Sequence, residues 1–284
     1  MPHKKYRQQL SDSTHFEDLS SSPQNGSAYK NSGVKNPGLT EIKTGKPNES
    51  AVQQDSAVID RFLYPSHYFK ITSSIMTWLA VNILRVHNKL YFGLKVTGKK
   101  HIKGLKGKSS VTVCNHVLGL DCTFVACQFK PGKLKFTSLQ SNLDRGFIGL
   151  LIRYLGSFPI PCSLADSMVF SRRVSEFLDR GISVHFFPEG HLIKYDKHLR
   201  EFNRGAYWYA YNNNVPVVPM VISYRKARGL RRLFRQKPSI NLDIFEPLYP
   251  DITKPRKEEA ERLLTVSKEL MRSKLEENNK NFLC

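Results

Sequence analysis

The chain has 284 residues, of which 40% are hydrophobic, and its 44 Lys and Arg outnumber its 24 Asp and Glu, giving a formal net charge of +20. This length and composition allow one ordinary hydrophobic core. The five cysteines are odd in number and form no CxxC pair, which argues against a disulfide framework and against a zinc site.

The first 57 residues are rich in Ser, Asn, Gln, Gly and Lys and lack hydrophobic periodicity, so residues 1–57 are predicted to be a disordered polar tail. This tail carries seven Lys or Arg and six acids, which leaves a net charge of +19 for the other 227 residues. A folded part this basic predicts an anionic partner, such as a lipid surface, a phosphorylated or acidic ligand, or nucleic acid.

Residues 58–92 are predicted to be a helical segment that associates with a membrane. Their apolar stretch, 71–86, is bracketed by Lys70 and Arg85 and interrupted by polar residues, so it is too short for a span of about 20 residues. Aromatic residues flank it on both sides, which favours a helix lying in the membrane interface. The alternative is an ordinary core helix.

The rest of the chain alternates predicted strands with helices, which indicates an α/β domain over residues 93–284 with a mixed sheet flanked by helices. A helix over 166–180 has Ser163 as a candidate cap and Gly181 as a candidate stop, and a C-terminal amphipathic helix begins at Pro255. The remaining predicted elements are a helix over 122–129 and strands over 94–96, 111–114, 133–137, 183–187, 217–223 and 240–245.

A candidate general base follows the strand over 111–114. This strand ends at Asn115 and His116, and Asp121 comes five residues after His116. Imidazole has an unperturbed pKa of about 6.5, and a carboxylate beside it would fix its tautomer. On a regular helix the two side chains would point about 140° apart, so their contact requires a turn, with Gly119 a plausible place for it.

Two further strand ends carry distinctive residues. The strand over 182–187 runs into Pro188, Glu189 and Gly190, which places an acidic residue at a second strand end. The apolar run over 215–224 contains Pro216 and Pro219, which suit a strand start or an edge strand rather than a central one.

Four short motifs in this order resemble those of the PlsC-like glycerolipid acyltransferases, the 1-acylglycerol-3-phosphate acyltransferase family. The resemblance covers about residues 90 to 245. Its motifs are Asn115-His116 followed at the HX4D spacing by Asp121, then Gly156-Ser-Phe-Pro-Ile160, Phe187-Pro-Glu-Gly190 and Val215-Pro-Val-Val-Pro219.

The resemblance implies an acyltransferase that moves a fatty acyl group from a thioester donor to a hydroxyl of a glycerolipid, with lysophosphatidate as the foremost acceptor, in phospholipid biosynthesis. His116 would deprotonate the acceptor hydroxyl, and Asp121 would orient His116. No acyl-enzyme and no cofactor are implied, because acyl-CoA or acyl carrier protein is a co-substrate. The residues expected to bind substrate are Asn115, Gly156, Phe187, Pro188, Glu189, Gly190, His191 and Arg204.

Two motifs depart from the family pattern. The third motif usually continues with Thr and Arg, but here His191 and Leu192 follow Gly190, and the second motif continues into Pro161 and Cys162 instead of a basic residue. Arg holds phosphate through a planar two-pronged contact that neither Leu nor Pro can imitate. Either His191, Lys194, Arg200 or Arg204 replaces this contact, or the acceptor lacks that phosphate.

The expected partners are a membrane with anionic lipids, a lipid acceptor and an acidic donor such as acyl carrier protein, whereas no nucleic-acid motif is found. We expect a monotopic or peripheral protein at the cytoplasmic face of a membrane, since no apolar run near the N-terminus resembles a secretory signal. The basic cluster over 225–237 is either a solvated face or part of this interface. The alternatives to an acyltransferase are an inactive basic protein that binds lipid or nucleic acid, and a metal-dependent hydrolase using His116, Asp121, His185, Glu189 and His191.

Overall fold

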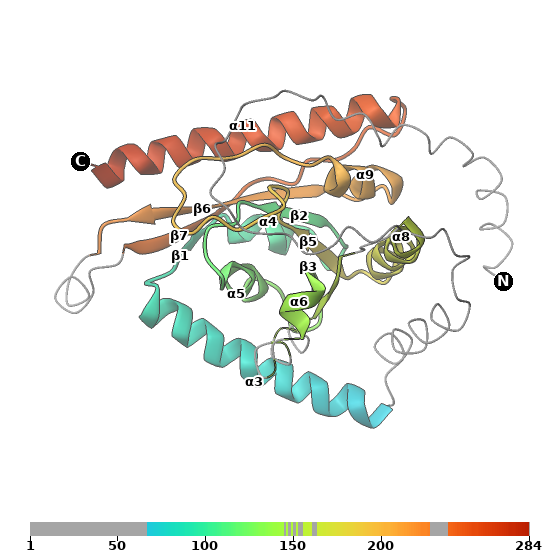
Figure 1. Ribbon diagram of the computed structural model, residues 1–284, viewed down its shortest axis with the longest axis horizontal. Coiled ribbons are helices and arrows are strands. Elements are labelled where there is room, and N and C mark those ends of the chain that lie inside the picture. The colour runs from blue at the N-terminus through green and yellow to red at the C-terminus, as the bar shows by residue number, and fades with distance from the viewer. Residues whose placement is uncertain are drawn as a thin grey trace, which may run out of the picture. The chain divides into compact units, whose positions relative to one another are not determined.

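A mixed sheet with the strand order β1-β7-β6-β2-β5-β3-β4 forms the centre of the computed structural model (Figure 1). The structure describes residues 67–283 with gaps at 145, 147–148, 150–151, 153–155, 161–163 and 228–237. The predicted disordered tail and residues 58–66 lie outside the described residues. The strands are β1 (Lys95–Thr97), β2 (Val111–Cys114), β3 (Leu134–Ser138), β4 (Ser157–Pro159), β5 (Ser183–Phe186), β6 (Val217–Arg225) and β7 (Ser239–Ile244).

Strand direction brings two of the predicted motifs to one edge of the sheet. Strands β2 to β6 run parallel to one another, whereas β7 runs antiparallel to β6 and parallel to β1. β2 and β5 are adjacent, with Val113 beside Phe186. The residues that follow these two strands therefore meet at their shared carboxyl edge, although they are far apart in sequence.

Helices cover both faces of the sheet (Figure 1). On β2, Val111 and Val113 face the layer of α8, α9 and α11, while Cys114 faces the opposite layer with α5. This alternation follows from the two-residue period of a strand. The helices are α3 (His67–Tyr91), α4 (Lys99–Gly104), α5 (Asp121–Ala126), α6 (Gln140–Leu143), α8 (Leu164–Asp179), α9 (Gly205–Asn212) and α11 (Arg256–Leu283).

The predicted mixed α/β fold is confirmed, and so is the stop of the helix before Gly181. Gly181 has a φ of 69°, and its N–H donates to Leu178 O while that of Ile182 donates to Phe177 O. This pattern closes a helix through a left-handed glycine. Ser163, the predicted cap of the same helix, lies outside the described residues.

Pro216 directly precedes β6, as predicted for a strand start. The prediction was wrong for Pro219, which lies inside β6, a strand paired on both sides. Pro219 O accepts the N–H of Phe245, the first residue after the end of β7. Since the N–H and C=O of a strand residue point the same way, the N–H that proline lacks would face this strand end, where the ladder has stopped. β2, on the other side, loses no hydrogen bond.

Helix α3 packs outside α5, on the opposite side of the sheet from α11 (Figure 1). Val81 and Leu84 face the protein and contact Cys127. Leu79, Ile83, Val86 and Leu90, spaced at helical intervals, are exposed on the other side, and Leu90 reaches 71% exposure. No helix among the described residues has both the length and the hydropathy needed to cross a bilayer.

Candidate active site

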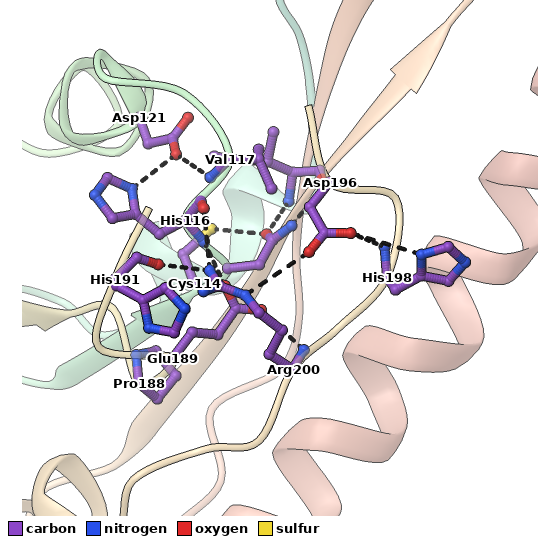
Figure 2. A network of polar contacts seen from close by, with 12 residues as sticks. Cys114, His116, Val117, Asp121, Pro188, Glu189, His191, Asp196, His198 and Arg200 are labelled. Carbon is purple, nitrogen blue, oxygen red and sulfur yellow. Dashed lines mark hydrogen bonds and ion pairs between the residues drawn. The ribbon is translucent and has the colours of Figure 1, made fainter. Parts of the chain in front are cut away.

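His116 and Asp121 are brought together by a tight turn between β2 and α5 (Figure 2). Their Nδ1 and Oδ2 atoms are 3.0 Å apart. The same Oδ2 accepts the backbone N–H of Val117 at 2.7 Å and of Leu118 at 2.8 Å, so the carboxylate itself organises the turn. Gly119 lies in this turn with an ordinary negative φ, and the turn does not depend on its being glycine.

These contacts fix the tautomer of His116. Asp121 Oδ2 is an acceptor of two backbone N–H groups, and a carboxylate oxygen offers only lone pairs, so Nδ1 of His116 carries the proton and donates it. Nε2 then carries a lone pair. The His116 side chain is 23% exposed while that of Asp121 is fully buried, so the imidazole is open to a ligand and its partner is not.

The environment of Asp121 is largely non-aqueous. Burial raises its pKa, and the hydrogen bonds from His116, Leu118 and Val117 offset only part of that rise. Its Oδ1 is buried and accepts no hydrogen bond from the described residues. A neighbouring positive charge would therefore stabilise this carboxylate. The imidazole of His116 supplies such a charge when it accepts a proton.

Phe187 forms a wall of the site. It directly follows β5, and its ring stacks on the His116 ring with centroids 4.0 Å apart and planes at 17°. An edge contact with His185 holds Phe187 from the other side, with centroids 4.7 Å apart. The stack fixes the orientation of the imidazole plane, which the one hydrogen bond to Asp121 leaves free.

Glu189 is directed into the protein rather than toward the open side of His116. Its Oε2 accepts the backbone N–H of His116 at 3.0 Å and a guanidinium N–H of Arg200 at 2.5 Å, and its Oε1 accepts the backbone N–H of Arg200 at 3.2 Å. Glu189 is 5% exposed. In this structure it supports the backbone of His116, and its role in an acceptor site stays a prediction.

Asn115 is also fully buried and holds strands together. Its Oδ1 accepts the N–H of Ile222 at 2.7 Å and its Nδ2 donates to Ile222 O at 3.0 Å. The side-chain amide thus imitates a backbone pair with β6, one residue past the end of β2. This anchors the residue immediately before His116.

The rest of the third motif shapes the start of the following loop. Pro188 O accepts two N–H groups of Asn203, from the backbone at 2.8 Å and the side chain at 2.9 Å. Gly190 has a φ of 77° and donates its N–H to Phe187 O, so the chain reverses there. His191 is exposed and lies beside Glu189 in Figure 2.

Two other predicted substrate-binding residues lie elsewhere. Gly156 precedes β4 and is level with Val111 at the start of β2, so it is about 14 Å to the side of the β2 strand and near its opposite end. Arg204 precedes α9, and its Nε donates to Glu261 of α11 at 2.7 Å. Their roles as substrate contacts stay predictions, since neither is placed with His116 here.

His185 supports the site by packing against Phe187. The sequence did not predict this role, and named His185 only as a residue of the alternative metal-dependent hydrolase. Its Nδ1 lies 2.7 Å from Thr112 Oγ1 on β2. Burial, with a smaller contribution from His116, lowers the pKa of His185 to about 3, so it is neutral. Within the described part of the chain, no three His, Cys, Asp or Glu side chains are grouped so that they could hold a metal ion.

Comparisons with known proteins agree on one class. The acyltransferase family model matches residues 93–223. A chloroplastic 1-acyl-sn-glycerol-3-phosphate acyltransferase of Arabidopsis thaliana is 33% identical over 133 residues, covering 44% of this chain and 36% of the relative, and one of Brassica napus is 32% identical with coverage of 44% and 37%. The chain therefore spans little more than a third of the length of these relatives.

The fold agrees with a solved structure as well. The 1-acyl-sn-glycerophosphate acyltransferase PlsC of Thermotoga maritima superposes with a TM-score of 0.55 at 20% identity, covering 79% of this chain and 88% of PlsC. At this identity the likeness concerns the fold alone. The matched family model, the plant relatives and this fold together support a PlsC-like glycerolipid acyltransferase family for the region over residues 93–223.

Proposed function

We propose that this protein transfers a fatty acyl group from a thioester donor to a hydroxyl of a glycerolipid acceptor. The observation that carries the proposal is the contact between His116 and Asp121 at the end of β2, which leaves Nε2 of a partly exposed imidazole free to accept a proton. The plant relatives, named for acylation of 1-acyl-sn-glycerol-3-phosphate, support the substrate class.

The reaction needs one base that later acts as an acid. Nε2 of His116 accepts the proton of the acceptor hydroxyl while the oxygen attacks the thioester carbonyl and forms the new C–O bond. The tetrahedral adduct then collapses, the C–S bond breaks, and the leaving thiolate takes the proton back from the imidazolium. A well-placed base of this kind contributes on the order of 10²–10⁴ in rate.

Asp121 and Phe187 have separate parts in this reaction. The buried Asp121 carboxylate stabilises the imidazolium in the adduct, where the attraction acts at low dielectric. Phe187 covers one face of the imidazole and keeps water off it. The two groups together select the orientation in which Nε2 faces the substrates.

The acceptor that we propose first is lysophosphatidate, with acyl-CoA or acyl carrier protein as donor. His191 and Lys194 are both exposed on the loop after the third motif. They are the basic side chains that follow this motif most closely in sequence, and we propose that they meet the phosphate. The net charge of +20 supports an acidic or phosphorylated donor.

We further propose that the protein works at a membrane surface with anionic lipids. The apolar stripe of α3, formed by Leu79, Ile83, Val86 and Leu90, lies on the side of the helix that faces away from the protein. A helix with one such face lies in the interface between head groups and acyl chains. This would place a lipid acceptor within reach without a membrane span.

Acyl transfer by the purified protein tests the proposal. The protein and its His116→Ala variant are offered acyl-CoA and acyl carrier protein donors, with lysophosphatidate and unphosphorylated lipid alcohols as acceptors. We expect turnover that falls by about 10²-fold or more in the variant. Absence of turnover with every pair, in a protein that still binds vesicles, would refute the proposal and favour a lipid-binding role.

A further inference from the structure

Arg200 makes an unusual set of contacts for a residue on a loop. A single guanidinium nitrogen, Nη2, lies 2.5 Å from Glu189 Oε2, 2.5 Å from His191 O and 3.3 Å from His116 O (Figure 2). Its backbone N–H also donates to Glu189. The side chain is only 17% exposed, and Nε lies 3.8 Å from Asp196 Oδ2.

The orientation of the guanidinium rules out direct use in the substrate site as the structure stands. Nη2 is surrounded by three protein oxygens, and both Nε and Nη1 are buried without a hydrogen-bond partner. Because Nε and Nη1 are buried, a phosphate at the open side of His116 would not reach their N–H groups in this structure. Although Arg200 is one of the basic residues that could replace the family's missing arginine, its contacts are with the protein.

Those contacts complete the fixation of the His116 main chain. The His116 N–H is held by Glu189, and the His116 carbonyl is held by Arg200 and by the N–H of Ile193 at 3.3 Å. The N–H of Tyr195 donates to Val117 O in the same loop. The loop therefore runs along the His116 turn and is fastened to it at several points, with Arg200 linking the loop, Glu189 and His116.

We propose that Arg200 is a positioning residue for the base His116, a proposal that rests on the proposed function. Its positive charge neutralises the buried Glu189 carboxylate. Its contacts with Glu189, His191 O and His116 O hold the His116 backbone at a fixed position relative to β5. Displacement of a base by about 1 Å can cost 10²-fold in rate.

A plain stabilising ion pair is the competing explanation, and α11 offers a matched control for it. Arg262 donates to the fully buried Glu259 at 2.5 Å, so it is the same chemistry in a place remote from His116. Loss of either arginine leaves a buried carboxylate without its cation, which strongly destabilises a fold. Only Arg200 is expected to affect the turnover of the folded enzyme.

The experiment compares Arg200→Met, Arg200→Lys, Arg262→Met and the double variant Arg200→Met with Glu189→Gln. For each variant we measure the free energy of unfolding in urea. We then measure kcat and KM under conditions in which the variant is folded. We expect Arg200→Met and Arg200→Lys to lower kcat at least about 10-fold with little change in KM. Arg262→Met should lose stability and keep kcat. The double variant, which no longer buries a lone charge, should regain stability and keep the low kcat.

Two outcomes would overturn the proposal. In one, kcat returns in the double variant together with stability, so that Arg200 only stabilises the fold. In the other, Arg200→Met raises KM for a phosphorylated acceptor and leaves kcat unchanged, so that Arg200 is a substrate contact.

A readout without turnover separates this proposal from the proposed function. The imidazole ¹⁵N signals of His116, assigned by comparison with His116→Ala, report the geometry of the bond to Asp121 in the full-length protein. We expect them to shift in Arg200→Met and to stay unchanged in Arg262→Met, even if no acyl transfer were found. Unchanged signals in both variants would count against the positioning role.

Discussion

The neutral, buried His185 makes the stability of the protein depend on pH in a predictable window. Burial lowers the pKa of His185 in the folded protein to about 3, whereas in the unfolded chain the group returns to about 6.5. Between these values the unfolded state binds one more proton than the folded state. Stability is therefore fully present above about pH 6.5 and falls as the pH drops from there toward 3.

The size of the effect follows from the two pKa values. At pH 8 the group is neutral in both states and contributes nothing to the difference. At about pH 5 the unfolded chain has bound a proton that the folded protein has not, which lowers the free energy of unfolding by about 2 kcal/mol. Below that pH each further unit removes about 1.4 kcal/mol until the folded-state pKa is reached.

Other groups titrate in the same range, so the measurement is a difference between two proteins. His185→Leu combined with Thr112→Val removes the titrating group and the hydroxyl that it contacts. Urea unfolding at about pH 8 and pH 5 should show a loss of stability that is about 2 kcal/mol smaller in this double variant than in the unchanged protein. Equal losses in the two proteins would mean that His185 is not a buried neutral group, and the reasoning would fail.

Four further outcomes are expected. Asp121→Asn should lower kcat by about 10²–10⁴-fold, measured by acyl transfer, because the amide no longer stabilises an imidazolium; a kcat within a few-fold would contradict this. Phe187→Ala should lower kcat with less effect on KM, since it removes the ring stacked on His116. Ile83→Asp with Val86→Asp should weaken flotation with anionic vesicles and leave the melting temperature unchanged, because both side chains are exposed. Gly98→Ala should lower the free energy of unfolding by more than about 2 kcal/mol, since φ is 70° and an added Cβ would lie 1.9 Å from Ile244 O.

Much of the fold could be predicted because the signals are local. The apolar run before Asn115 gives β2 at its observed bounds, and Gly181 ends α8 where the periodicity stops. β4 was missed as a strand, since three residues at a sheet edge carry too little pattern. The place of Pro219 in a central strand depends on where β7 ends, which is a property of the partner strand and not of the proline's neighbours.

The candidate site divides in the same way. The contact of His116 with Asp121 joins residues only five positions apart and could be predicted from the sequence. The contact of His116 with Glu189 depends on the register of β2 against β5, which repeats the interval of 73 residues seen for Val111 beside Val184. Arg200 reaches the same carboxylate by the path of a loop, and no periodicity specifies such a path.

The last helix in the chain closes the fold, and this affects how the protein is made. Asn278 of α11 donates to Ser223 of β6 and to Asp243 of β7, and Asp243 in turn accepts the hydroxyl of Thr97 on β1. During synthesis β1 has no partner strand until β7 has emerged, more than 140 residues later. The apolar face that α11 covers stays open to water for the same time. The nascent domain thus exposes an apolar sheet face and an unpaired strand edge until α11 docks. Its yield in cells should therefore depend on chaperones more than its native stability suggests.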